Sequence, residues 1–163
     1  MTRAAWYTLP AILGLLLPPA NHAGADCSAA LLGTWEYRQK AGEGYDAEGE
    51  RLILACAEGT LRGVYFGLER EGEHGLFYTA VETIDLKVST DGELSFSVGE
   101  RELFRERPHS LEDVTRRKSS SAGLTRDALY LRGRIKDGAL HLTCTANASC
   151  PEKDMVFRKG KWS

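Results

Sequence analysis

The four cysteines are the residues whose type and spacing most directly imply chemistry: Cys27, Cys56, Cys144 and Cys150. An even number of cysteines in a small chain is typical of disulfide-bonded domains, and four cysteines predict two disulfides, for which three pairings exist. We favour Cys27–Cys56 with Cys144–Cys150, because each of these bridges closes a local unit of the chain. The alternative is a metal site formed by His141, Cys144 and Cys150, but its spacing is not the paired C-x-x-C of structural zinc sites. The sequence therefore predicts disulfides and no metal.

The other reactive side chains form no recognisable catalytic pattern. The sequence has no H-E-x-x-H motif, no G-x-S-x-G turn and no phosphate-binding glycine loop. Two acidic side chains that neighbouring strands held at the right distance from each other would resemble the pair of carboxyl groups in a glycosidase. We expect these acids and the histidines to lie on solvated surfaces, so we predict no catalytic residue and no cofactor. The candidates on which an enzyme would have to rely are Glu69, Glu71, Glu73, Glu82, His74, His109 and His141.

A run of three cations, Arg116, Arg117 and Lys118, is the candidate contact for an anionic envelope partner such as a phospholipid or peptidoglycan. Glu112 and Asp113 stand close by in the sequence, so the run forms a weak site that salt screens easily. The whole chain has a formal net charge of −2. A near-neutral chain is not built to neutralise the phosphates of nucleic acid, so no nucleic-acid partner is predicted.

The first 25 residues predict a secretory signal peptide. Arg3 provides the positive charge, residues 11–17 form a short apolar segment, and Ala23-Gly24-Ala25 is a cleavage site of the A-x-A type. We therefore expect a secreted or periplasmic protein that begins near Asp26 and forms one domain over residues 26–163. No later apolar run is long enough for a membrane helix, so no transmembrane anchor is predicted.

Alternating apolar and polar residues predict that this domain is all-β. The alternation has a period of two, as expected for strands with one buried and one solvated face. Asp91-Gly92 and Asp137-Gly138 are typical of tight hairpins of type I′, with Glu58-Gly59 a looser relative. We expect an antiparallel meander of seven or eight strands, closed as a small barrel or folded as a β-sandwich. The strands are predicted within 34–38, 51–56, 64–68, 84–88, 94–98, 129–135, 140–144 and 155–158.

A charged excursion interrupts the meander at about residues 101–126. This segment contains seven basic and four acidic residues. Ser110, followed three residues later by Asp113, indicates the N-cap of a short helix, and the cations at 116–118 suit its C-terminus. The sequence thus predicts a charged loop or short helix inserted between strands.

The two ends of the chain suggest a family. Gly33-Thr34-Trp35 opens the first strand, and the last strand, from Met155, ends with Arg158 and Lys159. This arrangement resembles the calycins, the lipocalins and their relatives, in which a G-x-W on the first strand packs against a cation on the last strand. The resemblance implies that Arg158 or Lys159 lies over the ring of Trp35 and that the sheet closes as a barrel. It also implies a small apolar ligand inside the barrel.

The best functional interpretation of the sequence is a non-enzymatic binding module. Its ligand would be a small apolar molecule if the resemblance holds. The alternatives are a small secreted inhibitor that binds a protein partner, and an envelope enzyme that uses strand-borne carboxylates.

Overall fold

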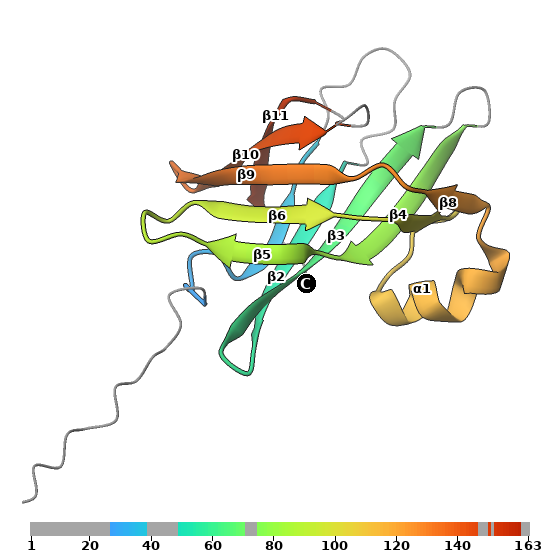
Figure 1. Ribbon diagram of the computed structural model, residues 1–163, viewed down its shortest axis with the longest axis horizontal. Helices are drawn as coiled ribbons and strands as arrows, with labels where there is room; N and C mark the ends of the chain where they lie inside the picture. Colours follow the sequence, from blue (N-terminus) through green and yellow to red (C-terminus); the bar gives the residue numbers. More distant parts are fainter. Residues whose placement is uncertain (1–26, 39–48, 71–74, 147–149, 151, 161–163) are drawn as a thin grey trace, which may run out of the picture.

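The computed structural model describes residues 27–38, 49–70, 75–146, 150 and 152–160. The predicted signal peptide, residues 1–25, lies outside this range. Nine strands form one antiparallel sheet in the order β4-β3-β2-β1-β11-β10-β9-β6-β5 (Figure 1). They are β1 (Gly33–Glu36), β2 (Arg51–Ala57), β3 (Thr60–Arg70), β4 (Leu76–Glu82), β5 (Ile84–Val88), β6 (Leu94–Val98), β9 (Leu129–Lys136), β10 (Ala139–Ala146) and β11 (Asp154–Lys159).

The sheet curls into a nearly closed antiparallel barrel. Its first and last strands pair, with Trp35 of β1 opposite Lys159 of β11. The two edges of the sheet, β4 and β5, are joined through Thr83, whose N–H donates to the Gly63 carbonyl of β3 at 2.9 Å. In Figure 1, β5, β6 and β9 cross in front of β2, β3 and β4. The barrel prediction is confirmed and the sandwich alternative is wrong, because both layers belong to one continuous sheet.

The charged excursion is an insertion between the paired strands β6 and β9. It consists of β7 (Arg101–Leu103), helix α1 (Leu111–Arg117), the 3-10 helix η2 (Lys118–Ser120) and β8 (Gly123–Thr125). β7 pairs with β8, and Phe104 bridges to Tyr78 on the β4 edge. The predicted cap is present, since the Ser110 side chain accepts from the N–H of Asp113 at 3.1 Å. The insertion therefore covers one sheet edge with an ordered unit.

The described residues form eleven strands, more than the seven or eight predicted. The sequence analysis missed β4 because Phe77 and Ala80, which point to opposite faces, are both buried. A strand covered on both sides shows no alternation. It also missed β7 and β8, since three residues are too few to establish a period of two. No helix in the described ranges is long and apolar enough to span a membrane.

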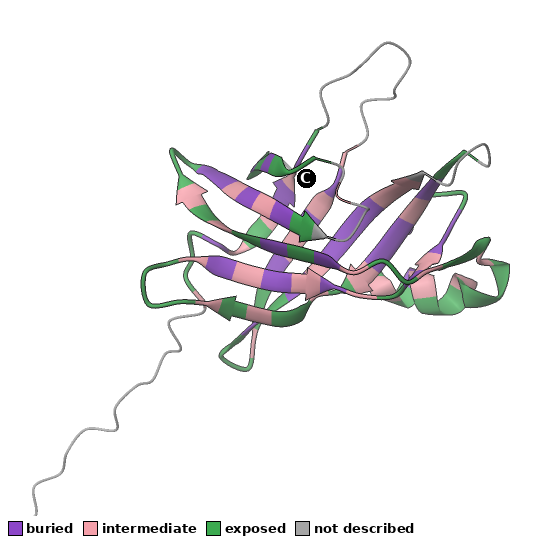
Figure 2. Cartoon of the chain, turned by 45° about the horizontal axis from the view of Figure 1, so that its top comes forward, coloured by how far each residue is buried: buried purple, intermediate pink, exposed green. Residues whose placement is uncertain are grey.

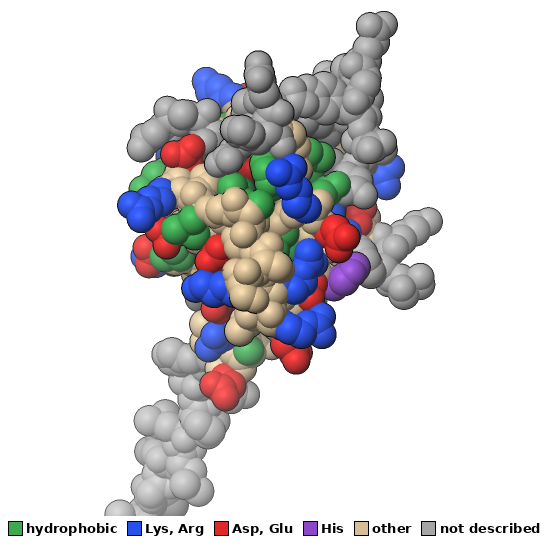
Figure 3. Space-filling model, turned by 90° about the vertical axis from the view of Figure 1, so that its right-hand side faces the viewer, with side chains coloured by type: hydrophobic (Ala, Val, Ile, Leu, Met, Phe, Trp, Pro, Cys, Tyr) green, Lys and Arg blue, Asp and Glu red, His purple; other side chains and the backbone are tan. Residues whose placement is uncertain are grey.

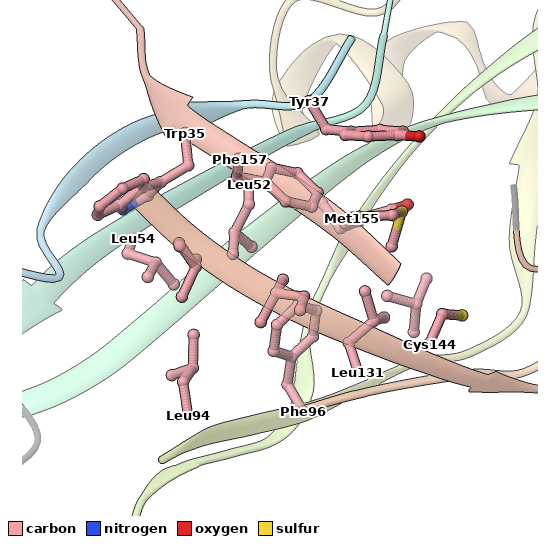
Figure 4. Packing of buried hydrophobic residues seen from close by; sticks show 14 of the residues in the cluster. Trp35, Tyr37, Leu52, Leu54, Leu94, Phe96, Leu131, Cys144, Met155 and Phe157 are labelled. Carbon is pink, nitrogen blue, oxygen red and sulfur yellow. The ribbon is translucent and has the colours of Figure 1, made fainter. Parts of the chain in front are cut away.

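The barrel interior is filled by the protein's own side chains. Buried residues alternate with partly exposed ones along most strands (Figure 2). In Figure 4 the inward side chains of β1, β2, β6, β9 and β11 pack against one another across the barrel. Burial of this apolar surface is the main stabilising contribution to the fold. Members of the cluster include Trp35, Tyr37, Leu52, Leu54, Tyr65, Phe96, Leu140, Met155 and Phe157, each no more than 5 % exposed.

Trp35 and Lys159 close one end of the barrel. The indole is 1 % exposed, and its Nε1 donates to the Leu31 carbonyl at 2.7 Å. Lys159 Nζ lies 4.1 Å from the centroid of the Trp35 ring and also donates to the Leu32 carbonyl. Of the two candidate cations, Lys159 thus contacts the ring, whereas Arg158 points to the other face of β11 and is exposed.

Both favoured disulfides are present. Cys27 bonds to Cys56 at the end of β2, near the tryptophan end of the barrel, and Cys144 bonds to Cys150 just after β10. Each bridge links residues that are close in sequence, at separations of 29 and 6 residues. They therefore fasten local units, as the sequence analysis expected.

The hairpin turns are of two kinds. Asp137-Gly138 has positive φ at both residues, 52° and 75°, as type I′ requires, and Glu58-Gly59 does the same. At Asp91-Gly92 only the glycine has positive φ, at 80°. There the Gly92 N–H donates to Ser89 O and the Ser89 N–H donates to Glu93 O, each at 2.9 Å. This turn is a three-residue loop with a glycine bulge, so its prediction as type I′ was wrong.

Replacing Gly138 with alanine is expected to destabilise the protein by about 1 kcal/mol. A Cβ at Gly138 would contact nothing within 4 Å, so the whole cost arises from its left-handed backbone. Gly123→Ala is the control, because Gly123 has no positive φ and its Cβ would meet Leu103 at an ordinary 3.7 Å. Urea unfolding of both variants provides the comparison. Equal losses in the two variants would contradict the assigned turn.

Candidate functional site

A cluster of buried polar side chains lies inside the barrel, at the end from which the insertion leaves. Glu50, just before β2, Tyr65 of β3 and Thr79 of β4 are each no more than 2 % exposed. They surround Gly67, where a Cβ would lie 2.9 Å from Thr79 Oγ1 and 3.1 Å from Glu50 Oε2. Glu50 Oε1 accepts from the Leu68 N–H at 3.3 Å. Glu50 Oε2, Tyr65 Oη and Thr79 Oγ1 have no hydrogen-bond partner within the described part of the chain.

Arg101, the first residue of β7, anchors the insertion to the barrel beside this cluster. Its side chain is fully buried and paired with Glu69 of β3, whose Oε1 accepts from Arg101 Nε at 2.9 Å. Arg101 Nη1 donates to the Gly99 carbonyl at 2.9 Å and to the Asp127 carbonyl at 2.5 Å. Gly99 follows β6 and Asp127 precedes β9. One guanidinium therefore ties both ends of the insertion to the barrel wall.

The protonation of Glu50 follows from its surroundings. Burial raises the pKa of the Glu50 carboxyl to about 7, and the Glu69 carboxylate acts in the same direction, while the nearby Tyr65 hydroxyl, the Leu68 N–H and Arg101 oppose it. Burial also raises the pKa of the Tyr65 phenol, which stays protonated. A protonated Glu50 is an O–H donor as well as an acceptor, which suits a cluster with unsatisfied oxygens. Glu50 therefore changes its charge near neutral pH.

Stability is expected to fall as the pH rises from about 5 to 8. The native pKa of Glu50, about 7, lies above the ordinary value of 4.5. The native state therefore binds more protons than the unfolded state in this interval, and the stabilisation present below pH 4.5 is lost through pH 7. The full difference amounts to roughly 3 kcal/mol. Glu50→Gln removes the titration, so its unfolding free energy should depend less on pH than that of the wild type.

The matched control for this measurement is Glu82→Gln, because Glu82 is an exposed carboxyl paired with Arg62 at the surface. This variant should retain the pH dependence of the wild type. Chemical unfolding at several pH values gives the comparison. If Glu50→Gln and Glu82→Gln show the same slope, Glu50 is not the titrating group.

A cavity of about 180 Å³ opens at this end, where β1 ends and β2 begins. Arg38, Arg51 and Arg107 line it, together with Glu36 and Glu50. Arg107 Nη2 donates to the Gly49 carbonyl at 3.1 Å, which fixes the insertion against the start of β2. Figure 3 faces the side of the molecule that carries α1, and it shows cations and carboxylates intermingled there rather than segregated. The surface here has no single dominant charge.

A second cavity, of about 230 Å³, is a groove on the outer face of the barrel over β5, β6 and β9. The small side chains of Ser95 and Ser97 on β6 form its floor. Larger side chains from the neighbouring strands β5 and β9 form its two sides. We call it the serine groove. The outward side chains that line it are Asp85, Lys87, Ser95, Ser97, Tyr130, Arg132 and Thr145.

The cationic run that was the candidate contact for an anionic partner pairs within the insertion. Arg116 Nη2 lies 2.6 Å from Asp113 Oδ1, and Arg117 pairs with both Asp113 and Glu106. Lys118 Nζ lies 3.6 Å from Glu102. Arg116 chiefly, with the His109 N–H and Arg117, lowers the pKa of Asp113. The acids of the insertion therefore offset much of the positive charge that the sequence suggested.

The remaining candidates do not converge on one site. His109 is exposed in the insertion and His141 is half-buried on β10. His74, Glu71 and Glu73 lie outside the described residues. Within the described ranges, no three side chains among His, Cys, Asp and Glu approach closely enough to hold a metal ion.

The sequence analysis did not identify the buried polar cluster or the serine groove. Glu50 and Arg101 stand in charged segments, where a charged residue normally predicts a solvated surface. Lys87, Ser95 and Arg132 were assigned correctly to solvated strand faces, but only the register of the strands places them side by side.

Comparisons with models of known protein families, with curated proteins and with solved structures found no match. The architecture itself is a nearly closed antiparallel barrel whose first and last strands pair. The chain is thus a small β-barrel protein compatible with a calycin-like fold.

Proposed function

We propose that the protein is a secreted or periplasmic, non-enzymatic binding module that holds its ligand in the serine groove, on the outside of the barrel. The observation that carries this proposal is the pair of cations, Lys87 and Arg132, that flank the groove without an ion-pair partner among the described residues. Ligand sites characteristically combine a concave surface with a few polar groups that converge on it. The two disulfides are in keeping with an oxidising compartment.

The packed interior argues against an apolar ligand inside the barrel. Leu52, Leu140 and Phe157 are 0 % exposed and lie where such a ligand would have to bind. Opening that space would require the core to separate, at the cost of its packing contacts. A ligand on the outer face requires no such change.

An enzyme that uses two carboxyl groups is less well supported. One candidate pair among the described residues is Glu50 with Glu69, because both lie at the insertion end and the Glu69 carboxylate raises the pKa of Glu50. Arg101 holds Glu69 in an ion pair, however, and Glu50 is 2 % exposed. A protein partner is the second candidate, since Tyr130, 51 % exposed beside the groove, is the type of residue that anchors protein interfaces.

Native mass spectrometry of the exported protein tests the proposal. A small molecule retained by the wild type should be lost from Ser97→Phe, which fills the floor of the groove. It should be retained by Ser119→Phe, which adds the same bulk to an exposed position in η2. Loss of the adduct from Ser97→Phe alone supports the groove as the site. An adduct that survives this substitution, or none in any sample, would overturn the proposal.

A further inference from the structure

The serine groove contains two neighbouring rows of side chains that run across the strands. In the first row, Ser95 of β6 lies directly between Lys87 of β5 and Arg132 of β9. Adjacent strands are about 4.8 Å apart, so the backbones that carry the two cations are separated by about 10 Å. Both side chains are long enough to reach an ion above the Ser95 hydroxyl. This row therefore has the composition of an oxyanion site, with two cations and one hydroxyl.

The two cations differ from Arg134, a neighbouring exposed arginine of the same sheet. Arg134 follows Arg132 by two residues on the same face of β9, and it pairs with Asp91 at 3.0 Å and Glu93 at 3.5 Å. Neither Lys87 nor Arg132 forms an ion pair with a residue that the structure describes. Asp85 is the one carboxylate among the described side chains that line the groove. The groove thus carries a net positive charge that its own residues do not neutralise.

The second row provides a flat aromatic surface next to this charge. Tyr130 lies between Ser97 of β6 and Thr145 of β10. Half of its surface is exposed, and the Thr145 hydroxyl donates to the Tyr130 carbonyl at 3.4 Å. Alternate residues on a strand are about 7 Å apart, so the ring stands next to the row of cations. An aromatic face bordered by hydroxyl groups is suited to a polar ring that stacks and forms hydrogen bonds.

The backbone of β5 is irregular at the rim of the groove. Asp85 has a φ of 52°, which is costly for a residue with a side chain, and the register of β5 against β6 shifts between Ile84 and Lys87. Such bulges often re-aim side chains beside functional sites. Here the irregularity lies at the strand that carries Lys87.

We infer that the serine groove binds a sugar carrying an oxyanion, with the anionic group between Lys87 and Arg132 above Ser95 and the sugar ring on Tyr130. This inference rests on the proposed function and specifies its ligand class. The groove, at about 230 Å³, is many times larger than the roughly 10–15 Å³ that a single water molecule requires. That is room for a single ring and one charged substituent. A free sugar phosphate and an anionic unit of a glycan chain share this chemistry.

Titrations followed by amide NMR distinguish these sources. The probes are glucose 6-phosphate, a heparin-derived sulfated oligosaccharide, glucose and inorganic phosphate, all at one pH and ionic strength. At least one anionic sugar should shift the amides of Ser95, Ser97 and Arg132 at lower concentration than glucose or phosphate does. Binding of glucose 6-phosphate alone identifies a free sugar phosphate, and binding of the oligosaccharide alone identifies a glycan.

Substitutions test which side chains bind the anionic group of the ligand and which bind its sugar ring. Lys87→Gln and Arg132→Gln should each weaken binding of the anionic sugar by about tenfold, because each removes a charge-assisted hydrogen bond. Arg134→Gln, on the same strand face but outside the groove, should leave the affinity unchanged. Tyr130→Ala should weaken binding of the sugar severalfold, with no effect on inorganic phosphate. All of these side chains are exposed, so the variants should fold.

Three results would overturn the inference. If glucose bound as tightly as the anionic sugars, the anionic group would not contribute to the affinity. If inorganic phosphate bound as tightly as the anionic sugars, the sugar ring would not contribute to the affinity. If no probe shifted the amides, the groove would bind neither the anion nor the sugar. In each case the native mass spectrometry above still decides whether another molecule occupies the groove, so failure of this inference is separable from failure of the proposed function.

Discussion

Replacing Arg101 with leucine is expected to lower the free energy of unfolding by about 3–5 kcal/mol. The substitution leaves the Glu69 carboxylate, 15 % exposed, without the guanidinium that neutralises it. It also removes the donor to the carbonyls of Gly99 and Asp127, so the two ends of the insertion lose their common anchor. The measurement is urea unfolding at pH 7, together with proteolysis to detect release of the insertion.

The control for this variant is Arg126→Leu. Arg126 belongs to the same insertion and pairs with Glu100, but its side chain is 83 % exposed. Its loss should cost less than about 1 kcal/mol. The double variant Arg101→Leu/Glu69→Leu should recover part of the stability, because no unpaired buried charge remains. If Arg101→Leu alone unfolded like the wild type, Arg101 would not hold the insertion in place.

Replacing Trp35 with alanine is expected to cost about 3–5 kcal/mol. The indole is 1 % exposed at the centre of the tryptophan end, and its removal leaves a cavity that the rigid strands β1, β2 and β11 cannot fill. It also removes the surface on which Lys159 rests. Thermal and urea unfolding measure the loss.

Two further variants separate the contributions at this end. Lys159→Met retains much of the packing but removes the cation, and should cost about 0.5–2 kcal/mol. Tyr130→Ala removes an aromatic residue of similar type from the outer face and should cost less than about 1 kcal/mol. If Trp35→Ala lowered the free energy of unfolding no more than Tyr130→Ala does, Trp35 would not be a core residue.

The parts of the fold that the sequence predicted are those with local signals. A period of two places Leu94 and Phe96 inside and Ser95 and Ser97 outside, as the structure has them. Glycine after aspartate marked the turns, although the three-residue loop at Gly92 depends on Ser89, whose N–H and carbonyl close it. The capping pattern at Ser110 located the helix because both partners lie within one turn.

The features of the structure that the sequence did not predict depend on contacts between segments that are distant in the chain. Arg101 can be buried because Glu69 pairs with it, whereas burial raises the pKa of Glu50 to about 7, so that its carboxyl group is largely neutral below that pH. Arg132 and Arg134 are equivalent in the sequence pattern. Arg134 nevertheless forms an ion pair, whereas Arg132 forms none with a residue that the structure describes, because different residues lie opposite them. Such distinctions arise from register, which the sequence of a single strand does not contain.

The pairing of β1 with β11 also sets an order of events during folding. Six of the strand pairs in the barrel join strands that follow one another directly along the chain, so they can form as hairpins while synthesis proceeds. β1 must wait for β11, and the bond from Lys159 to the Leu32 carbonyl spans 127 residues. Contacts of such long range form slowly, because the chain between them must first be closed into a loop. A polypeptide that emerges with its N-terminus first therefore cannot close the barrel until its last strand is available, which is in keeping with the export that we propose.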